Sequence, residues 1–266
     1  MQISISVVSH GHFSIIDTLG CIDELSKKNW IKICIVDNIG ESGFNTWCEE
    51  RNIIYIKNNK KLGFGRNNNI AFDKLKNSSE HEEYQYFLVL NPDVSITIEQ
   101  LEKLMLEVVE NQIRFCCINL FKDFRYSDYD NSIRNYPGLF DFISSFVFSI
   151  NKTIINKSCI SHPQYVDWAS GSFLLFDSKL FESLSGFDEK YFMYCEDIDI
   201  CFRARLKENC KLLYMPEIKA VHLAAHNNRK ILSRHFIWHV RSIFRYLVVK
   251  NLLLAKKYFS DFVSDI

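Results

Sequence analysis

This sequence of 266 residues lacks several features that would assign a protein class at once. It has no net charge, because 32 basic residues balance 32 acidic ones. An anionic partner would therefore have to bind a local patch of basic residues, and the overall charge does not indicate nucleic-acid binding. It has no uninterrupted apolar run long enough to span a bilayer, and no repeat, low-complexity segment or obvious linker. A hydrophobic content of 47% predicts a globular chain with one large domain or two close-packed lobes.

The nine cysteines include no C-x-x-C pair, and their number is odd. Most lie in apolar runs, as reduced core residues do. This pattern argues against a secreted disulfide framework and against a structural zinc site, and it favours a cytosolic location. The first residues have neither a basic n-region nor a signal-length apolar run, so we expect a strand there instead of a signal peptide.

The first third alternates strand-like and helix-like segments, which is the pattern of an α/β fold. The expected strands are Ile3–Val8, Ile31–Val36, Ile53–Ile56 and Tyr86–Leu90. Polar residues follow three of them, namely Ser9-His10, Asp37-Asn38 and Asn91-Pro92-Asp93. In an open α/β sheet, ligands bind outside the carboxyl ends of the strands, so we expect the three clusters to converge on one crevice.

The rest of the chain is less regular. A helix is expected at about Ile98–Asn111, whereas the aromatic segment from Phe115 to Tyr165 predicts no definite element. The later expectations are a strand within Val166–Phe176 that is entered through a glycine, a helix over about Ser178–Ser185, a turn at Gly186-Phe-Asp188, short strands Leu212–Met215 and Ile218–His222 around Pro216, and a long helical tail.

Three carboxylates, those of Glu196, Asp197 and Asp199, lie within four positions of an otherwise apolar and aromatic stretch. If the apolar residues at 198, 202 and 206 form the buried stripe of a helix, Glu196, Asp199 and Arg203 share another face, and Asp197 points about 100° away from Glu196. Asp197 would then be available for chemistry. The structural alternative is an acidic first turn that complements the helix dipole, with an Asp199–Arg203 ion pair.

A divalent cation site is one interpretation of Asn91 and Asp93. Pro92 has no N–H group to continue a strand ladder, so the strand ends there and two oxygen-bearing side chains lie close together. Such oxygens suit a hard cation that also binds a substrate diphosphate. His222 ends a short strand and could supply a third ligand. The alternatives are an Asn-Pro turn and a structural histidine.

The segment from Lys61 to Phe72 contains Gly63, Gly65 and Arg66, followed by three asparagines at 67–69. Its backbone donors and Arg66 could bind phosphate. The spacing matches neither a dinucleotide fingerprint nor a P-loop. The alternative is a plain loop whose asparagines cap a helix.

The C-terminal segment 229–257 is basic and strongly apolar, and it contains no Asp or Glu. Arg234, Arg241 and Arg245 fall on one helical stripe. The apolar residues that oppose them include Phe236, Val240, Phe244 and Leu247. This arrangement is typical of an interfacial helix, and the alternative is a core-packing helix with a solvated basic face.

The order of these motifs resembles the family 2 glycosyltransferases through nearly the whole chain. The matching motifs are Val8-Ser-His10, Val36-Asp-Asn38, Leu62-Gly-Phe-Gly-Arg-Asn-Asn-Asn69, Leu90-Asn-Pro-Asp93, Trp168-Ala-Ser-Gly-Ser-Phe173 and Gly186 to Asp199. The resemblance is closest to the rhamnosyltransferases of bacterial O-antigen assembly. It implies a GT-A fold, which is an α/β fold with a central, mostly parallel mixed sheet flanked by helices. It also implies a nucleotide-sugar donor, Mg²⁺ or Mn²⁺, and inversion at the anomeric carbon.

The resemblance also implies roles for individual residues. Asp197 matches the general base, beside Glu196, and Asp93 and His222 match metal ligands. The implied nucleotide-sugar contacts are Ser9, His10, Asp37, Asn38, Gly63, Arg66, Asn68 and Asn91, and the implied acceptor contacts are Trp168, Gly171 and Asp199. One departure is that Asn91 replaces the first aspartate of the family's metal motif, so the cation would depend more on the donor diphosphate.

We therefore expect a glycosyltransferase domain at 1–228, with a nucleotide-binding half at 1–112 and an acceptor half at 113–228, and a basic helical segment at 229–266. The implied reaction moves L-rhamnose from dTDP-rhamnose to a polyprenyl diphosphate-linked saccharide at the inner face of the cytoplasmic membrane. The alternatives are another donor such as a UDP-hexose, a metal-dependent phosphohydrolase, and a non-catalytic protein that binds sugar nucleotide or lipid.

Overall fold

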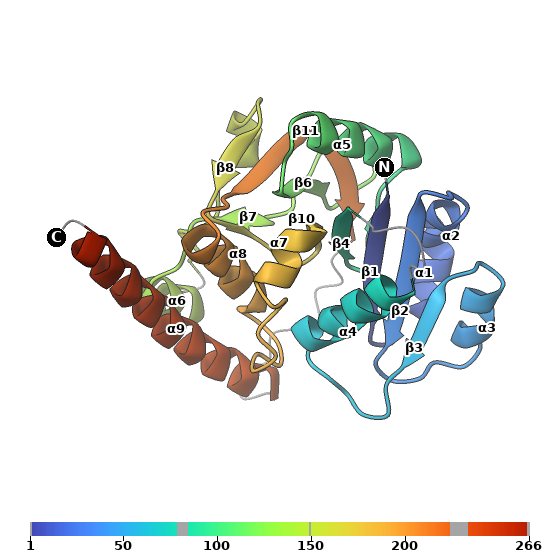
Figure 1. Ribbon diagram of the computed structural model, residues 1–266. Helices are drawn as coiled ribbons and strands as arrows, with labels where there is room; N and C mark the ends of the chain where they lie inside the picture. Colours follow the sequence, from blue (N-terminus) through green and yellow to red (C-terminus); the bar gives the residue numbers. More distant parts are fainter. Residues whose placement is uncertain (1, 79–84, 149, 224–233, 265–266) are drawn as a thin grey trace.

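A nine-stranded sheet forms the centre of the computed structural model (Figure 1), which describes residues 2–78, 85–148, 150–223 and 234–264. The strands of this sheet are β1 (Ile3–Ser9), β2 (Ile31–Asp37), β3 (Ile54–Lys57), β4 (Tyr86–Leu90), β5 (Val94–Ser95), β6 (Phe115–Phe121), β8 (Gln164–Val166), β10 (Phe173–Asp177) and β11 (Leu212–His222). Two short strands, β7 (Ile133–Arg134) and β9 (Trp168–Ala169), pair with each other in a separate ladder.

The strand order is β3-β2-β1-β4-β10-β6-β11-β5, with β8 paired to β11. The strands β3, β2, β1 and β4 are parallel, β10 runs antiparallel to both β4 and β6, and β11 is parallel to β6. The carboxyl ends of β1, β2, β4, β6 and β11 therefore share one edge of the sheet with the amino end of β10. We call it the carboxyl edge.

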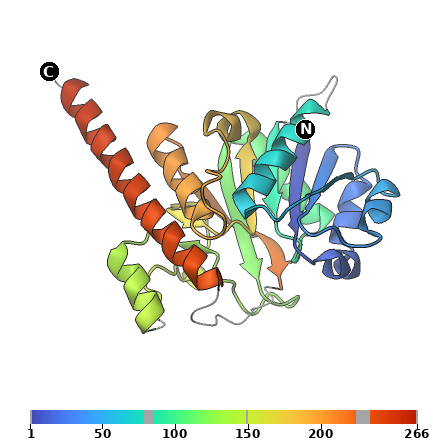
Figure 2. The ribbon, with the colours of Figure 1, turned by 90° about the horizontal axis from the view of Figure 1, so that it is seen from below.

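Helices cover both faces of the sheet (Figures 1 and 2). They are α1 (Phe13–Leu19), α2 (Cys21–Ser26), α3 (Phe44–Glu49), α4 (Phe64–Asn77), α5 (Ile98–Glu110), α6 (Leu139–Val147), α7 (Ser178–Ser183), α8 (Glu196–Lys207) and α9 (Arg234–Ser264), with a 3₁₀ turn at Lys157–Cys159. Because side chains alternate along a strand, each strand feeds two cores. Ile5 packs on the face with α2, α3 and α5, and Val89 packs on the face with α4, α7 and α8.

Most of the predicted elements are confirmed, and one is wrong. The four N-terminal strands and the helix after Ile98 lie within two residues of their expected bounds. The two short strands expected around Pro216 are one continuous strand, β11, whose register against β6 shifts between Met215 and Lys219. Pro216 has no N–H group for the ladder, so the chain bulges there and continues in the same direction.

The long C-terminal helix is also present, but its predicted basic stripe is not uniformly exposed. Ile243 and Tyr246 are buried against the body of the protein, and Arg245 forms an ion pair with Asp188, so this arginine belongs to the docked side of α9. Val240 and Phe244, expected to oppose the arginines, are exposed. No helix among the described residues is long and apolar enough to cross a membrane.

Candidate active site

The predicted polar clusters meet at the carboxyl edge, as the parallel register requires. Ser9 and Asp37 are register partners at the ends of β1 and β2, and Asn38 N donates to Ser9 O at 2.9 Å. Asn91 N, just past β4, donates to Ser172 O at 2.9 Å, just before β10. Strand ends that are far apart in the sequence therefore form one continuous polar rim.

The first turn of α8 brings Asp197 to the same rim. Gly171 N donates to Asp197 Oδ2 at 3.3 Å, and the next residue, Ser172, accepts the hydrogen bond from Asn91. A Cβ atom on Gly171 would lie 2.8 Å from the Phe64 ring, so a larger residue would force that ring to move. Asp197 is thus joined to the segment that carries Asp93 through two consecutive residues.

Asp37 is buried and is held by its own loop. Its carboxylate accepts from Ile39 N at 3.0 Å, Gly40 N at 2.9 Å, Glu41 N at 2.6 Å and the Tyr55 hydroxyl at 2.8 Å. Burial alone would raise the pKa of Asp37, but these hydrogen bonds outweigh burial and lower it. Asp37 is therefore an anion at neutral pH and fixes the loop that follows β2.

Glu41 is a residue of this loop that the sequence did not indicate. Its carboxylate accepts from the Ser9 hydroxyl at 2.9 Å and from the backbone N–H groups of His12, at 3.1 Å, and Phe13, at 3.1 Å. Ser9, which was predicted to contact the nucleotide sugar, therefore connects the loop after β1 to the loop after β2. His10 is partly exposed at the rim, and its partial burial, together with the nearby charge of Lys61, lowers its pKa.

The glycine-rich segment is anchored to the second strand and to the loop before α8. Asn38 accepts from Leu62 N at 2.8 Å and donates to Leu62 O at 2.9 Å. A Cβ atom on Gly63 would lie 2.5 Å from Phe192 O, and Phe64 N donates to that oxygen at 3.1 Å. Glycine at 63 is thus required by the close backbone contact. The glycine-rich segment therefore packs directly against the loop that precedes α8.

The three asparagines lie inside α4 and do not cap it, which corrects the capping alternative, because the helix begins after Gly63 without a side-chain cap. Asn68 is buried, accepting from the Ser6 hydroxyl at 2.7 Å, and Asn69 bonds both backbone groups of Phe187. Asn68 therefore braces the fold beneath the rim. Arg66 is half exposed and pairs with Glu189 at 3.3 Å, which is a weak surface contact.

Glu196 and Asp197 form a carboxylate pair with little hydrogen bonding. Burial raises the pKa of Asp197, although bonds from Ile198 N and Gly171 N and the charge of Arg134 oppose this. Burial and the adjacent Asp197 raise the pKa of Glu196 to about 8. Glu196 Oε2 has no hydrogen-bond partner within the described residues. Of the two buried carboxyl groups, Asp197 has the two backbone hydrogen bonds and the nearby charge of Arg134 that favour its charged form.

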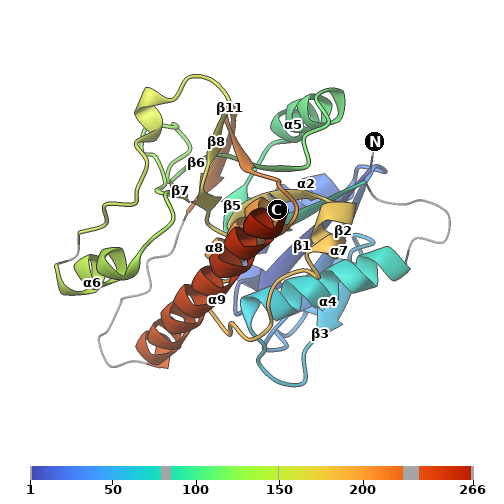
Figure 3. The same ribbon diagram turned by 60° about the vertical axis from the view of Figure 1, so that its left-hand side comes forward.

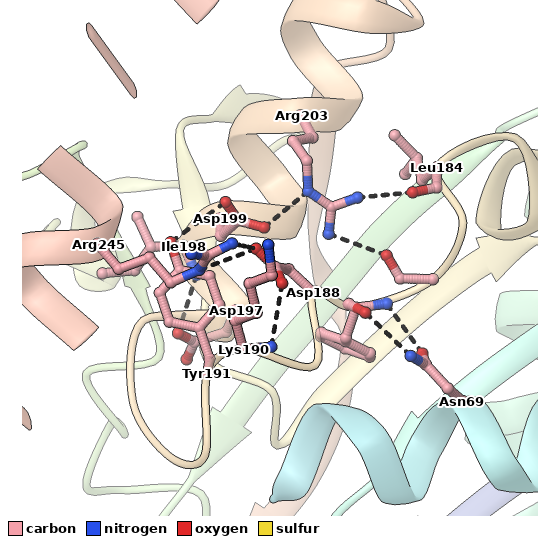
Figure 4. A network of polar contacts seen from close by, with 12 residues as sticks. Asn69, Leu184, Asp188, Lys190, Tyr191, Asp197, Ile198, Asp199, Arg203 and Arg245 are labelled. Atoms are coloured by element: carbon pink, nitrogen blue, oxygen red, sulfur yellow. Dashed lines mark hydrogen bonds and ion pairs between the residues drawn. The ribbon is translucent and has the colours of Figure 1, made fainter. Parts of the chain in front are cut away.

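Asp199 serves the fold, as the structural alternative for this residue predicted (Figure 4). It is buried and accepts from Arg203 Nε at 2.7 Å, while Arg203 also donates to Leu184 O at 2.7 Å and to Gly186 O at 2.9 Å. The network fixes the loop that leads into α8. Trp168 is also buried and donates to Asn135 O at 2.9 Å. Neither predicted acceptor contact is thus presented at an open surface.

Asp93 and His222 come together at the rim, and a third residue, Asp130, joins them. His222 Nε2 lies 3.4 Å from Asp93 Oδ1, and His222 Nδ1 lies 2.6 Å from Asp130 Oδ2. Burial alone would lower the pKa of His222, but the two carboxylates raise it to about 9. Among the described residues, no group of three His, Cys, Asp or Glu side chains could hold a metal ion by itself. Asp93 and His222 could therefore provide part of a cation site, with Asp130 behind the imidazole.

Arg134 is a second residue of the site that the sequence pattern did not indicate. Its charge acts on Asp197, and its guanidinium lies 5.5 Å from the centre of the Trp168 ring. Both Asp130 and Arg134 belong to the segment 115–165, which predicted no definite element. Their positions follow from contacts with β9 and β11, so no local pattern could have indicated them.

Comparisons with known proteins agree with this geometry. The model of the family described as "Glycosyl transferase family 2" matches residues 17–178. The chain is 37% identical, over its full length and 99% of the relative, to "Rhamnosyltransferase WbbL" of Escherichia coli (strain K12). It is also 37% identical over 86 residues, 32% of this chain and 28% of the relative, to the "N-acetylglucosaminyl-diphospho-decaprenol L-rhamnosyltransferase" of Mycobacterium tuberculosis (strain ATCC 25618 / H37Rv).

Two solved structures show the same fold. GalNAc-T7, solved with UDP, GalNAc and Mn²⁺, gives a TM-score of 0.65 at 12% identity, over 94% of this chain and 48% of that one. This chain thus spans about half the length of that protein. The mannosyltransferase PcManGT from Pyrobaculum calidifontis, solved with GDP-Man and Mn²⁺, gives 0.56 at 11% identity, over 96% of this chain and 74% of that one. The predicted GT-A fold is confirmed.

Proposed function

The chain belongs to glycosyltransferase family 2, and on this premise we propose that it transfers L-rhamnose from dTDP-rhamnose to a lipid-linked saccharide acceptor. The donor sugar is supported by the full-length relative, which is a rhamnosyltransferase. The acceptor class is supported by the mycobacterial relative, whose name specifies a saccharide on a diphospho-lipid. The observation that carries the proposal is the link from Asp197, through Gly171 and Ser172, to the rim that holds Asn91 and Asp93.

The donor would lie along the carboxyl edge. Of the predicted nucleotide contacts, His10 and Arg66 are exposed enough to touch it directly. Asp37, Asn38 and Asn68 would act through the loops and the helix that they fix, because their side chains are already engaged. The Arg66–Glu189 contact would open at little cost, since an exposed ion pair contributes about 0–1 kcal/mol.

Asp93 and His222 would hold a divalent cation, Mn²⁺ or Mg²⁺, together with the donor diphosphate, and the His222 imidazole would release its Nε2 proton to solvent when the cation binds. When bound, the cation would stabilise the negative charge on the departing nucleoside diphosphate. Asp130 would hold the imidazole in the orientation that points Nε2 at the cation, as carboxylates behind metal-binding histidines do. Asn91 contributes no charge, which fits a site completed by the donor.

In the proposed reaction, an acceptor hydroxyl attacks the anomeric carbon while the bond from that carbon to the diphosphate oxygen breaks. Asp197 accepts the hydroxyl proton, and no covalent intermediate forms. Glu196, held neutral by burial, leaves the negative charge of the pair on Asp197. Arg134 lies close enough to stabilise that charge before the proton arrives.

A lipid-linked acceptor would place the protein at the inner face of the cytoplasmic membrane. We propose that the segment after residue 228 keeps it there, because α9 carries basic residues and an exposed apolar side. A folded chain that ends at residue 228 should then move from the membrane fraction to the soluble fraction.

The function is tested by following the purified protein with dTDP-rhamnose and Mn²⁺, with and without a polyprenyl diphosphate-linked N-acetylglucosamine. The proposal predicts release of dTDP and formation of a rhamnosylated lipid only when the acceptor is present. Release without acceptor would favour a phosphohydrolase, and binding without turnover would favour a non-catalytic protein. Parallel reactions with UDP-hexoses and other deoxyhexose donors test the sugar.

A further inference from the structure

Two helices expose apolar side chains at the same end of the molecule. On α6, Phe140 is 83% exposed, and its neighbours Leu139 and Ile143 are exposed as well. On α9, Phe244 is 72% exposed and shares one helical face with the exposed Val248 and Leu252, at positions i, i+4 and i+8. Soluble surfaces expose single apolar residues commonly, but a contiguous set marks an interaction site.

The two helices are packed against each other, which brings the exposed apolar residues of both helices to one end of the molecule. The Phe142 ring of α6 meets the Tyr246 ring of α9 edge-on, with centroids 6.1 Å apart. Lys250 Nζ of α9 donates to Pro137 O, just before α6, at 3.2 Å. Figure 2 shows both helices at the end of the molecule away from α1, α2 and α3, and Figure 3 shows α9 running across the front.

The charges beside this surface identify its partner. Arg241, Lys256 and Lys257 are exposed on α9, and the sequence from 229 to 257 contains no acidic residue. On α6, the carboxylate of Asp141 is engaged by Gly138 N at 2.8 Å, where it caps the helix. Apolar side chains flanked by cations fit an anionic lipid headgroup layer with acyl chains beneath it. A second copy of the chain would meet like charge on the same face.

The surface is tied rigidly to the candidate base. Arg245 of α9 pairs with Asp188, and Ser242 of α9 donates to Met193 O at 2.8 Å. Both partners lie in the loop that enters α8, whose first turn carries Asp197 (Figure 4). A helix that lies on the membrane through its outer side would therefore hold Asp197 at a fixed height above the lipid.

We propose that α6 and α9 together form a surface that lies on an anionic lipid bilayer, with Phe140 and Phe244 inserted among the acyl chains. This inference rests on the proposed function, because a lipid-linked acceptor is what the fixed height would serve. It goes beyond membrane attachment through the tail by making α6 an equal part of the contact.

The test is co-sedimentation of the full-length protein with phosphatidylglycerol-containing vesicles and with purely phosphatidylcholine vesicles. The variants are Phe140→Ser, Phe244→Ser and the matched control Phe124→Ser, which alters a 62% exposed phenylalanine between β6 and β7. Binding should be stronger to the anionic vesicles. Each of the first two variants should weaken it about tenfold, as expected for losing one buried aromatic side chain, and the control should not.

Two results would overturn the proposal. One is unchanged vesicle binding in Phe140→Ser, which would remove α6 from the surface. The other is a dimer in sedimentation velocity that Phe140→Ser or Phe244→Ser dissociates, which would assign the surface to a second copy. Transfer to a water-soluble acceptor analogue separates this question from the reaction. If the variants keep that activity but lose vesicle binding, both proposals stand. If the wild-type protein binds vesicles as expected but transfers no sugar to the analogue, the proposed function alone is contradicted.

Discussion

The loop after β2 and the first turn of α8 each place an aspartate at the carboxyl edge, and the pKa values of these two aspartates are shifted in opposite directions. Asp37 accepts four hydrogen bonds, and its pKa is lowered. Asp197 accepts two backbone bonds beside a buried glutamic acid, and its pKa is raised. A carboxylate with many donors is a permanent anion that orders a loop, and one with few donors in a dry site can take up a proton.

The two halves of the candidate site therefore differ in how completely their polar groups are hydrogen-bonded. The half formed by β1, β2 and α4 is pre-ordered by polar side chains that already have partners, such as Asn38, Glu41 and Asn68. The half formed by α8 leaves Glu196 and Asp197 with poorly satisfied carboxyl groups. Substitutions in the first half should therefore change stability and donor binding, and those in the second half should change turnover.

The largest expected effect is that of Asp197→Asn. The amide keeps the size of the side chain but cannot accept the proton, so turnover should fall by about 10²–10⁴-fold, the usual contribution of a general base. The dissociation constant for dTDP-rhamnose, measured by titration, should stay within a few-fold of wild type. Turnover close to wild type would remove Asp197 from the role of base.

Asp37→Asn, in the half formed by β1, β2 and α4, should reduce the stability of the protein. The new amide would direct N–H groups toward backbone N–H donors, and the free energy of unfolding should fall by about 2–4 kcal/mol, as for lost bonds to a buried charge. Denaturant unfolding measures this change. Asp73→Asn on the exposed side of α4 is the matched control and should be neutral, and equal stability of the two variants would contradict the assigned role.

Asp130→Asn tests the candidate cation site, which lies outside both halves. Loss of the carboxylate behind His222 should weaken Mn²⁺ binding in the presence of dTDP about 10–100-fold, the usual effect of such an outer-shell partner. Paramagnetic resonance of bound Mn²⁺ gives the dissociation constant without any turnover. Asp128→Asn, which alters an exposed carboxylate paired with Lys122, should leave it unchanged. Equal affinities in both variants would separate Asp130 from the cation.

The smallest effect concerns Glu196→Gln and the pH dependence of stability. The folded protein holds the Glu196 proton up to a pKa of about 8, whereas the unfolded chain releases it near 4.5. Because the folded state binds more protons between these values, wild-type stability should decrease as the pH rises. The slope is about 1.4 kcal/mol per pH unit for one proton. Glutamine does not titrate, so thermal unfolding at pH 6 and pH 7 should show a smaller decrease in the variant.

The sequence predicted the parts of the fold and site that depend on local pattern. Strand periodicity placed Asp37 and Asp93 at strand ends, and parallel order then brought them to one edge. Helical periodicity separated Asp197 from the Asp199–Arg203 pair. These features follow from backbone geometry within about ten residues, so they are readable without a structure.

The remaining parts depend on contacts between distant segments. Asp130 meets His222 across 92 positions in the sequence, and the segment that carries it has no helical or strand period. Asn68 has the residue type of a ligand contact, but its position on α4 turns it toward Ser6 of β1. Which polar residue faces a ligand and which faces a neighbouring element is decided by packing, and the sequence pattern is the same in both cases.

The most direct test of the central claim is the configuration of the new glycosidic bond, determined by NMR of the isolated product. If Asp197 removes the acceptor proton during a single displacement, the anomeric carbon of the transferred sugar must have the configuration opposite to that in the donor. Retention of the donor configuration would contradict the account, because a single displacement from the side opposite the leaving group always inverts the anomeric carbon.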